Sequence, residues 1–212
     1  MVQRELSLFK YILFLVAVLL VFRCKNSENE VETFSKLFFV DTSKIPHDTV
    51  LSTNENLMLK NGLYYLNKHP FSGYIKDSDQ NHQLRILASY LNGMQHGITK
   101  TFYPNGKLRD SRAYKENRSF GKHYGYWENG NQKFEFFYLN DKREGSNKQW
   151  YESGQAYAFL NFKDDKEEGM QQAWRQNGKP YINYQAKNGF RYGLQKSGLC
   201  YTLIDEKLKQ TK

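Results

Sequence analysis

Apolar and polar residues alternate between residues 84 and 162, which predicts β-strands with one buried face. The alternation is clearest in three apolar series: Leu84, Ile86, Ala88, Tyr90; Phe134, Phe136, Tyr138; and Ala156, Ala158, Leu160, Phe162. The corresponding stretch 108–114 contains Asp110 and Arg112 instead, which indicates either a more open middle or a local change of face. Aromatic residues on the opposite parity, such as Phe137 and Phe159, favour a curled or twisted sheet that covers both faces.

Glycine recurs at a fixed interval of 24 residues, so these strands belong to an internal repeat. The six positions are Gly73, Gly97, Gly121, Gly145, Gly169 and Gly193. Two further columns share the period: an aromatic residue at Phe102, Tyr126, Trp150 and Trp174, and a second glycine at Gly106, Gly130, Gly154 and Gly178. Because two strands span about 10 Å, six units predict an elongated sheet of roughly 55–60 Å.

Each repeat contains two turns, and consecutive turns of this kind predict hairpins. Asn105-Gly106 in the stretch FYPNGKL predicts a type I′ turn, with positive φ at both residues. The second turn class falls at Asn92-Gly93, Glu116-Asn117, Asn140-Asp141, Asp164-Asp165 and Asn188-Gly189. The predicted fold is therefore all-β, an up-and-down antiparallel sheet of 24-residue hairpin repeats.

The repeat glycine falls inside a strand, where glycine normally weakens the sheet. In successive hairpins these glycines are expected to align across the sheet. We expect an aromatic side chain from a neighbouring strand to lie over the bare backbone, a known way to stabilise strand glycines.

The segments HGITKTFYPNGKL, KREGSNKQWYESGQ and KEEGMQQAWRQNGKP resemble the MORN-repeat variant of bacteria. The resemblance covers roughly residues 57–193, with a degenerate unit at 73–96 where Asn81-His82 replaces Asn-Gly. It implies hairpin repeats that contact proteins or membrane lipids. Bacterial proteins with this repeat are often labelled YwqK-like antitoxins, which implies a second role, the neutralisation of a toxin by direct binding.

The remaining segments flank this array of repeats at 73–193. Residues 25–56 are predicted to form a polar tether and N-terminal flank, and 57–72 a hairpin around Asn61-Gly62 that caps the first repeat edge. Residues 194–212 are predicted to supply a closing strand, GLCYTLI, and a tail.

Residues 1–24 carry an export signal. Arg4 and Lys10 precede the apolar run 11–22, whose helix of about 18 Å is too short for a bilayer core of about 30 Å. This is the signal-peptide pattern, although the longer span 6–22 could serve as an uncleaved anchor. The sequence RCKNSENE that follows resembles a bacterial lipoprotein start, with Cys24 as the lipidated residue, but Arg23 departs from the small residue expected there. We expect an exported, membrane-associated protein of the cell envelope, in the outer membrane or periplasm.

Composition and charge change this picture little. The formal net charge is +9 and aromatic residues make up 16% of the chain. Basic residues are mixed with acidic ones at strand ends and turns, which favours a solvated sheet face over a nucleic-acid site. Two cysteines, Cys24 and Cys200, do not form a disulfide framework.

No chemical motif accompanies the repeats. None of the five histidines has a partner at metal-ligand or catalytic spacing, and Cys200 is interpreted as a buried strand residue. We therefore predict no catalytic, cofactor or metal residues, no cofactor, and no nucleic acid or small-molecule substrate. The prediction is a non-enzymatic envelope-associated repeat protein that binds or scaffolds an unknown protein or membrane component. Antitoxin action is the alternative, and an envelope enzyme is a third hypothesis without a motif.

Overall fold

The computed structural model describes residues 37–195, 201–204 and 207–210. Residues 1–39 and 40–212 form two separate units, and all described strands belong to the second. The predicted signal segment, Cys24 and Cys200 lie outside the described residues, as does the tether to residue 36. Within the described part of the chain, no helix is long and apolar enough to span a membrane.

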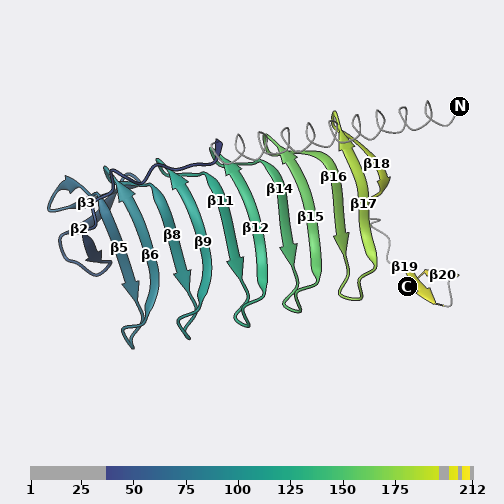
Figure 1. The fold of residues 1–212 in the computed structure, drawn as a ribbon, viewed down its shortest axis with the longest axis horizontal. Coiled ribbons are helices and arrows are strands. Elements are labelled where there is room, and N and C mark those ends of the chain that lie inside the picture. Colours follow the sequence, from purple (N-terminus) through teal and green to yellow (C-terminus); the bar gives the residue numbers. More distant parts are fainter. Residues whose placement is uncertain (1–36, 196–200, 205–206, 211–212) are drawn as a thin grey trace, which may run out of the picture. The chain divides into compact units, whose positions relative to one another are not determined.

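A single sheet of fifteen strands contains the whole repeat array, and its hairpins follow one another in chain order (Figure 1). From β5 to β18 every neighbouring pair of long strands is antiparallel. The predicted all-β, up-and-down arrangement of hairpin repeats is thereby confirmed. The long strands are β5 (Gly73–Ser78), β6 (Leu84–Leu91), β8 (Gly97–Phe102), β9 (Leu108–Lys115), β11 (Gly121–Tyr126), β12 (Gln132–Leu139), β14 (Gly145–Trp150), β15 (Ala156–Lys163), β16 (Lys166–Trp174), β17 (Pro180–Lys187) and β18 (Phe190–Leu194).

The two turn classes differ in geometry, and one prediction was wrong. At the two-residue turns both residues have positive φ, as at Asn92 (52°) and Gly93 (80°), which is the type I′ pattern. At the other edge only the glycine is positive, and Gly106 N donates to Tyr103 O at 2.9 Å. FYPNGKL is therefore a type I turn followed by a left-handed glycine, because Pro104 favours the second position of a type I turn. We call this edge of the sheet the tip edge.

The repeat glycines have positive φ at all six positions, between 67° at Gly145 and 138° at Gly73. In three repeats a two-residue strand comes just before the long strand that the glycine begins, and a single residue separates the two strands. The short strands are β7 (Met94–Gln95) before Gly97, β10 (Arg118–Ser119) before Gly121 and β13 (Lys142–Arg143) before Gly145. The glycine thus allows a kink between two stretches of pairing. Its cross-strand partners include Tyr114 for Gly97 and Phe162 for Gly145.

An aromatic side chain from a neighbouring strand covers Gly125, which is outside the 24-residue column, and within the column Cζ of Phe71 would lie 3.0 Å from a Cβ atom at Gly73. A Cβ atom at Gly125 would lie 2.5 Å from Cε1 of Phe134. A Cβ atom at Gly97 would instead meet Ser89, Ile45 and Thr42, none of them aromatic. Close approach of segment 42–45 and positive φ therefore explain Gly97, and the expected aromatic cover is wrong there.

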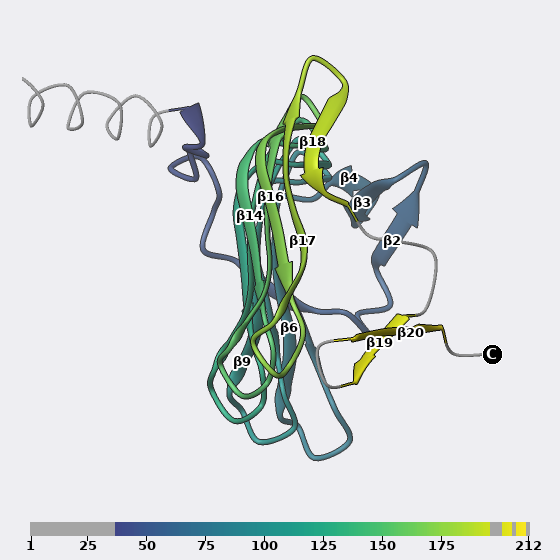
Figure 2. The same ribbon diagram turned by 90° about the vertical axis from the view of Figure 1, so that its right-hand side faces the viewer.

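Figure 2 shows the large sheet edge-on, with one face on either side. The cross-strand pairs assign side chains to these two faces. One face carries Tyr90, Tyr114 and Tyr138, and we call it the tyrosine face. The other carries Lys76, Lys100, Lys122 and Lys148, and we call it the lysine face. The three alternating apolar series of the sequence all lie on the tyrosine face.

The ends of the sheet differ from the expectation. The hairpin of β2 (Leu57–Lys60) and β3 (Leu63–Leu66) forms, but with β4 (His69–Pro70) it makes a separate sheet. The edge of β5 is covered by the parallel strand β1 (Thr49–Leu51). At this end Phe71, Ile75, Ala88 and Tyr90 form a buried cluster, against which Tyr64 of β3 packs.

The predicted closing strand at 194–212 is also wrong in part. The large sheet ends at β18, whereas β19 (Tyr201–Ile204) pairs with β20 (Lys207–Gln210) in a sheet of their own. A local hairpin satisfies the backbone groups of residues 201–204 without the large sheet.

Candidate binding surface

The paired aromatic residues at the tip edge link one repeat to the next. Tyr103 Oη donates to Tyr126 O at 2.8 Å, and Tyr151 Oη donates to Trp174 O at 2.8 Å. Trp127 Nε1 donates to the corresponding carbonyl, that of Trp150, at 3.1 Å. The recurrence of these residues every 24 positions is therefore explained by stability, because each hydrogen bond joins neighbouring hairpins.

The recurrent acidic residues of the two-residue turns have the same kind of role. Asp141 Oδ1 accepts a hydrogen bond from Ser119 N at 2.7 Å, and Arg143 Nε lies 2.5 Å from Asp165 Oδ1. The hydrogen bond from Arg143 lowers the pKa of Asp165. Asp165 is therefore held as a charged acceptor between repeats, which does not suit a general acid.

A buried polar column crosses the tyrosine face two residues after the repeat glycines Gly121, Gly145 and Gly169. His123, Asn147 and Gln171 occupy it, and each bonds the backbone of the strand before it. Gln171 is fully buried, accepts from Asn161 N at 3.2 Å and donates to Asn161 O at 2.7 Å. These side chains fill the places where ladder pairing between neighbouring hairpins is interrupted, so they complete the sheet.

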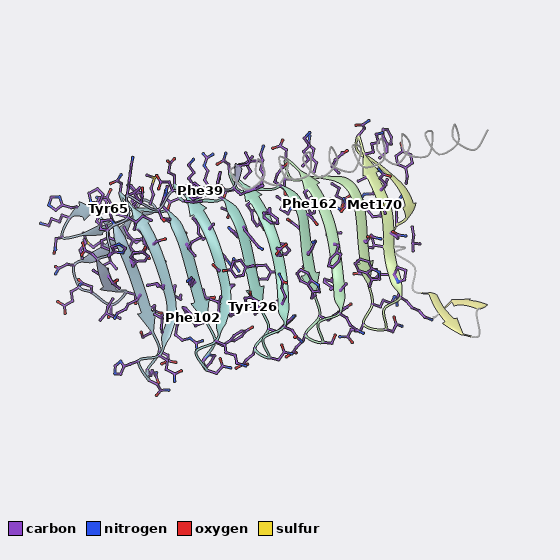
Figure 3. The ribbon with its side chains drawn as sticks, viewed as in Figure 1. Phe39, Tyr65, Phe102, Tyr126, Phe162 and Met170 are labelled. Atoms are coloured by element: carbon purple, nitrogen blue, oxygen red, sulfur yellow. The ribbon has the colours of Figure 1, made fainter. Side chains whose placement is uncertain are left out.

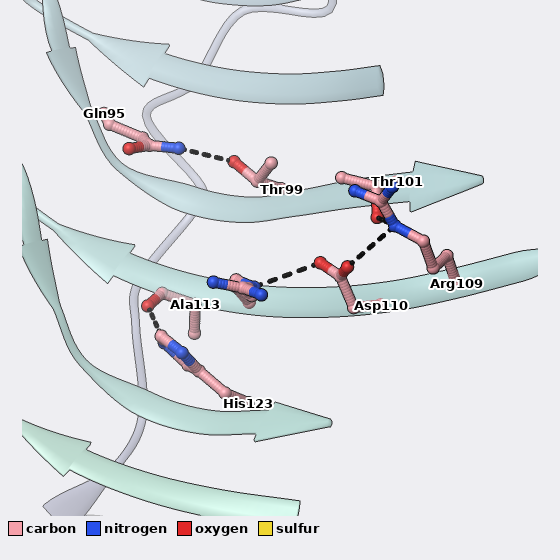
Figure 4. Close-up of polar contacts among 8 residues, drawn as sticks. Gln95, Thr99, Thr101, Arg109, Asp110, Ala113 and His123 are labelled. Carbon is pink, nitrogen blue, oxygen red and sulfur yellow. Dashed lines mark hydrogen bonds and ion pairs between the residues drawn. The ribbon is translucent and has the colours of Figure 1, made fainter. Parts of the chain in front are cut away.

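His123 is 4% exposed and lies between the rings of Tyr114 and Tyr138, with centroids 5.5 and 4.7 Å away. Its Nε2 donates to Ala113 O at 2.7 Å, which sets the tautomer (Figure 4). Burial lowers the pKa of His123, and the hydrogen bond to Ala113 opposes this. A neutral, enclosed imidazole of this kind has a structural role.

Asp110, the residue that broke the alternating pattern, lies on the tyrosine face and is 5% exposed. Its carboxylate accepts from Arg112 Nε at 3.1 Å and from Arg109 Nε at 3.3 Å, and Arg109 also reaches Thr101 (Figure 4). The face does not change at this point. Two arginines compensate the buried charge instead, a partnership that only the folded sheet reveals.

Among the described residues, no group of three His, Cys, Asp or Glu side chains is placed to hold a metal ion. An open groove near β18 is lined by Arg143, Phe162, Glu167 and Arg191. Some of its charges are paired, since Arg191 Nε lies 2.9 Å from Glu167 Oε2 and Arg143 pairs with Asp165. Its other charged residues include both lysine and glutamate, at Lys163, Lys166 and Glu168, so the groove has no single sign of charge.

Side chains project all along the sheet (Figure 3). On the lysine face a row of directly paired residues crosses ten strands, and we call it the basic row. It contains three lysines, one acidic residue, two aromatic rings, one apolar side chain and three neutral polar ones. In order these are Lys76, Leu87, Lys100, Ser111, Tyr124, Glu135, Lys148, Phe159, Gln172 and Asn183.

The lysines of the basic row are largely uncompensated. No ion pair joins Lys76, Lys100 or Lys148 to another described residue, and the first two are exposed. Lys148 Nζ lies 5.8 Å from the centre of the Phe159 ring. The acid of the row, Glu135, is paired with Lys122 beside it at 2.7 Å. The three lysines share one column of the repeat, three residues after Gly73, Gly97 and Gly145, a signal that the sequence carries but that the prediction did not use. The other members of the row join them only through strand pairing.

No protein-family model matches this chain, and no curated protein matches it.

Proposed function

We propose that this chain is a non-enzymatic, MORN-like repeat protein that binds or scaffolds a protein or membrane component of the cell envelope. The basic row carries the proposal, since it combines unpaired cations with aromatic side chains on one continuous face. Strands about 4.8 Å apart place equivalent residues of successive repeats about 10 Å apart. A partner with regularly spaced negative groups would then make many weak contacts at once.

Reversal of the row's charge tests this proposal. In the full chain, Lys76, Lys100 and Lys148 are changed together to Glu. The matched control makes the same change at Lys60, Lys68 and Lys179, which are exposed and lie off the row. Both variants are used in pull-downs from envelope extract and in flotation with anionic or neutral vesicles, at low and high salt.

The row variant is expected to lose binding and the control to keep it, and salt should weaken the native interaction because exposed charges are screened. The vesicle arm and the protein arm identify the class of partner. Equal binding by the row variant and the control would refute the role of the basic row. Recovery of a toxic protein that the chain neutralises would favour the antitoxin alternative.

Membrane association is a separate part of the proposal and depends on residues 1–24. We propose export by the apolar segment 11–22, with lipidation at Cys24 as the specific form of anchoring. Labelling with palmitate, with and without Cys24→Ser, tests it. Unchanged labelling in the variant would exclude lipidation at this cysteine.

A further inference from the structure

The large sheet ends in the three-residue strand β1 on one side and in β18 on the other. At the first, β1 pairs with β5. At the other, β18 pairs with β17, and no other described strand pairs with it (Figure 1). An unpaired edge strand presents free backbone groups to another chain.

The backbone groups that β18 leaves free can be assigned from its pairing. Lys187 and Phe190 flank a two-residue turn, and such a pair exchanges both of its hydrogen bonds. The backbone N–H and C=O groups of successive residues point to opposite sides of a strand. Since those of Phe190 point toward β17, those of Arg191 and Gly193 point away from it. Consistent with this, among the described residues Arg191 O accepts a long side-chain hydrogen bond, 3.3 Å from Gln195 Nε2.

The side chains of β18 are apolar on one face and well exposed. Phe190, Tyr192 and Leu194 are 66%, 61% and 54% exposed, and their pairing places them on the lysine face. Arg191 lies on the opposite face, paired with Glu167. β18 thus combines three exposed large hydrophobic residues with a single charge, which Glu167 neutralises, and has little of the charged protection that natural edge strands usually have.

We propose that the free edge of β18 pairs antiparallel with the same edge of a second copy of this chain, centred on Tyr192. In this register the outward groups of Arg191 meet those of Gly193 of the other copy, which forms hydrogen-bonded pairs at both ends. Tyr192 faces its own equivalent in a non-hydrogen-bonded pair, where side chains approach most closely.

A second copy fits this edge for two reasons. Phe190 meets Leu194 of the other copy, so apolar residues face apolar ones across the pair. Arg191 meets a glycine, so no cation faces another. The symmetry axis is perpendicular to the sheet, and the basic rows of both copies therefore lie on the same face of one continuous sheet.

The interface is small, because each copy contributes one five-residue strand. Stable dimers bury about 1,200–2,000 Å², so this pairing is expected to be weak and dependent on concentration. Association is therefore tested by trapping it.

Single cysteines along β18 report the register. In the full chain with Cys24→Ser and Cys200→Ser, one cysteine is placed at position 190, 192 or 194 and the protein is oxidised with copper–phenanthroline. The Cα atoms of a non-hydrogen-bonded pair are about 4.5 Å apart, within disulfide range. Tyr192→Cys alone should give a disulfide-linked dimer on a non-reducing gel. Phe190→Cys and Leu194→Cys should give it only when mixed.

A second test of the same pairing uses opposite charges at position 192 and needs no cysteine. Tyr192→Lys and Tyr192→Glu should each reduce association in sedimentation experiments, and their mixture should restore it. Ile98→Lys is the control, because Ile98 is an exposed apolar residue of the same face on an inner strand. Equal crosslinking at all three positions, a crosslink to a different protein only, or no recovery in the mixture would overturn the proposal.

Discussion

Gly97 offers a direct test of why the repeat glycine is required. Its φ is 92°, and a Cβ atom there would lie 2.7 Å from Ser89 Oγ and 3.0 Å from Cδ1 of Ile45. Gly106 of the tip edge has a similar φ of 80°, but no heavy atom lies within 4 Å of its Cβ position. Gly106→Ala therefore measures only the free-energy cost of a non-glycine residue at positive φ. Gly97→Ala measures that cost together with the cost of the close contacts around the new Cβ atom.

The two costs differ in size. A non-glycine residue in a left-handed conformation costs about 1–2 kcal/mol, which is the expected effect of Gly106→Ala. Gly97→Ala adds crowding of about 1–3 kcal/mol. It also displaces Ser89 Oγ from its 3.0 Å hydrogen bond to Ile98 O, a loss of about 1 kcal/mol. We expect about 3–6 kcal/mol in total for Gly97→Ala.

Urea unfolding of both variants, followed by circular dichroism, measures the free energies of unfolding. The cost of Gly97→Ala should fall by about 1 kcal/mol or more in a Ser89→Ala background, because the contacting oxygen is then absent. Equal destabilisation by Gly97→Ala and Gly106→Ala would refute the close-contact account. It would leave positive φ as the sole reason for the column.

Three further predictions concern the hydrogen bonds within and between repeats. His123 has a lowered pKa in the folded chain, so the unfolded state binds the proton more readily. Stability should fall as pH drops below about 6.5, and urea unfolding from pH 7 to 5 should show less of this decline in His123→Gln. Gln171→Leu leaves both backbone groups of Asn161 unpartnered and should cost about 2–4 kcal/mol by urea unfolding. Tyr151→Phe removes the hydrogen bond to Trp174 O and should cost about 0.5–1.5 kcal/mol, whereas full retention of stability would show that water replaces it.

Much of the fold could be predicted from the sequence because its signals are local. A two-residue turn such as Asn92-Gly93 needs positive φ at neighbouring positions, and its spacing from the next turn sets the strand length. The alternating apolar series correctly identified one face of the sheet. The tip turn was misassigned because Asn-Gly fits two turn types, and Pro104 selects the type I turn only when the whole loop is considered.

The candidate surface could not be predicted in the same way. Lys100 and Lys148 stand in the same repeat column, but Tyr124 lies between them and Glu135 joins the row from the other strand class. Only strand register places these side chains side by side. The same holds for Asp110, whose arginine partners include Arg109, assigned by sequence parity to the other face.

The sequence by itself determined the 24-residue hairpin, the two turn positions and the antiparallel order, since each depends on residues close together in the chain. Tertiary structure alone decided what each repeat residue meets. It placed β1 in parallel beside β5, brought Ile45 and Thr42 against Gly97, and left the edge of β18 without a described partner. These contacts join segments distant in sequence, and their energies depend on close packing that no local pattern encodes.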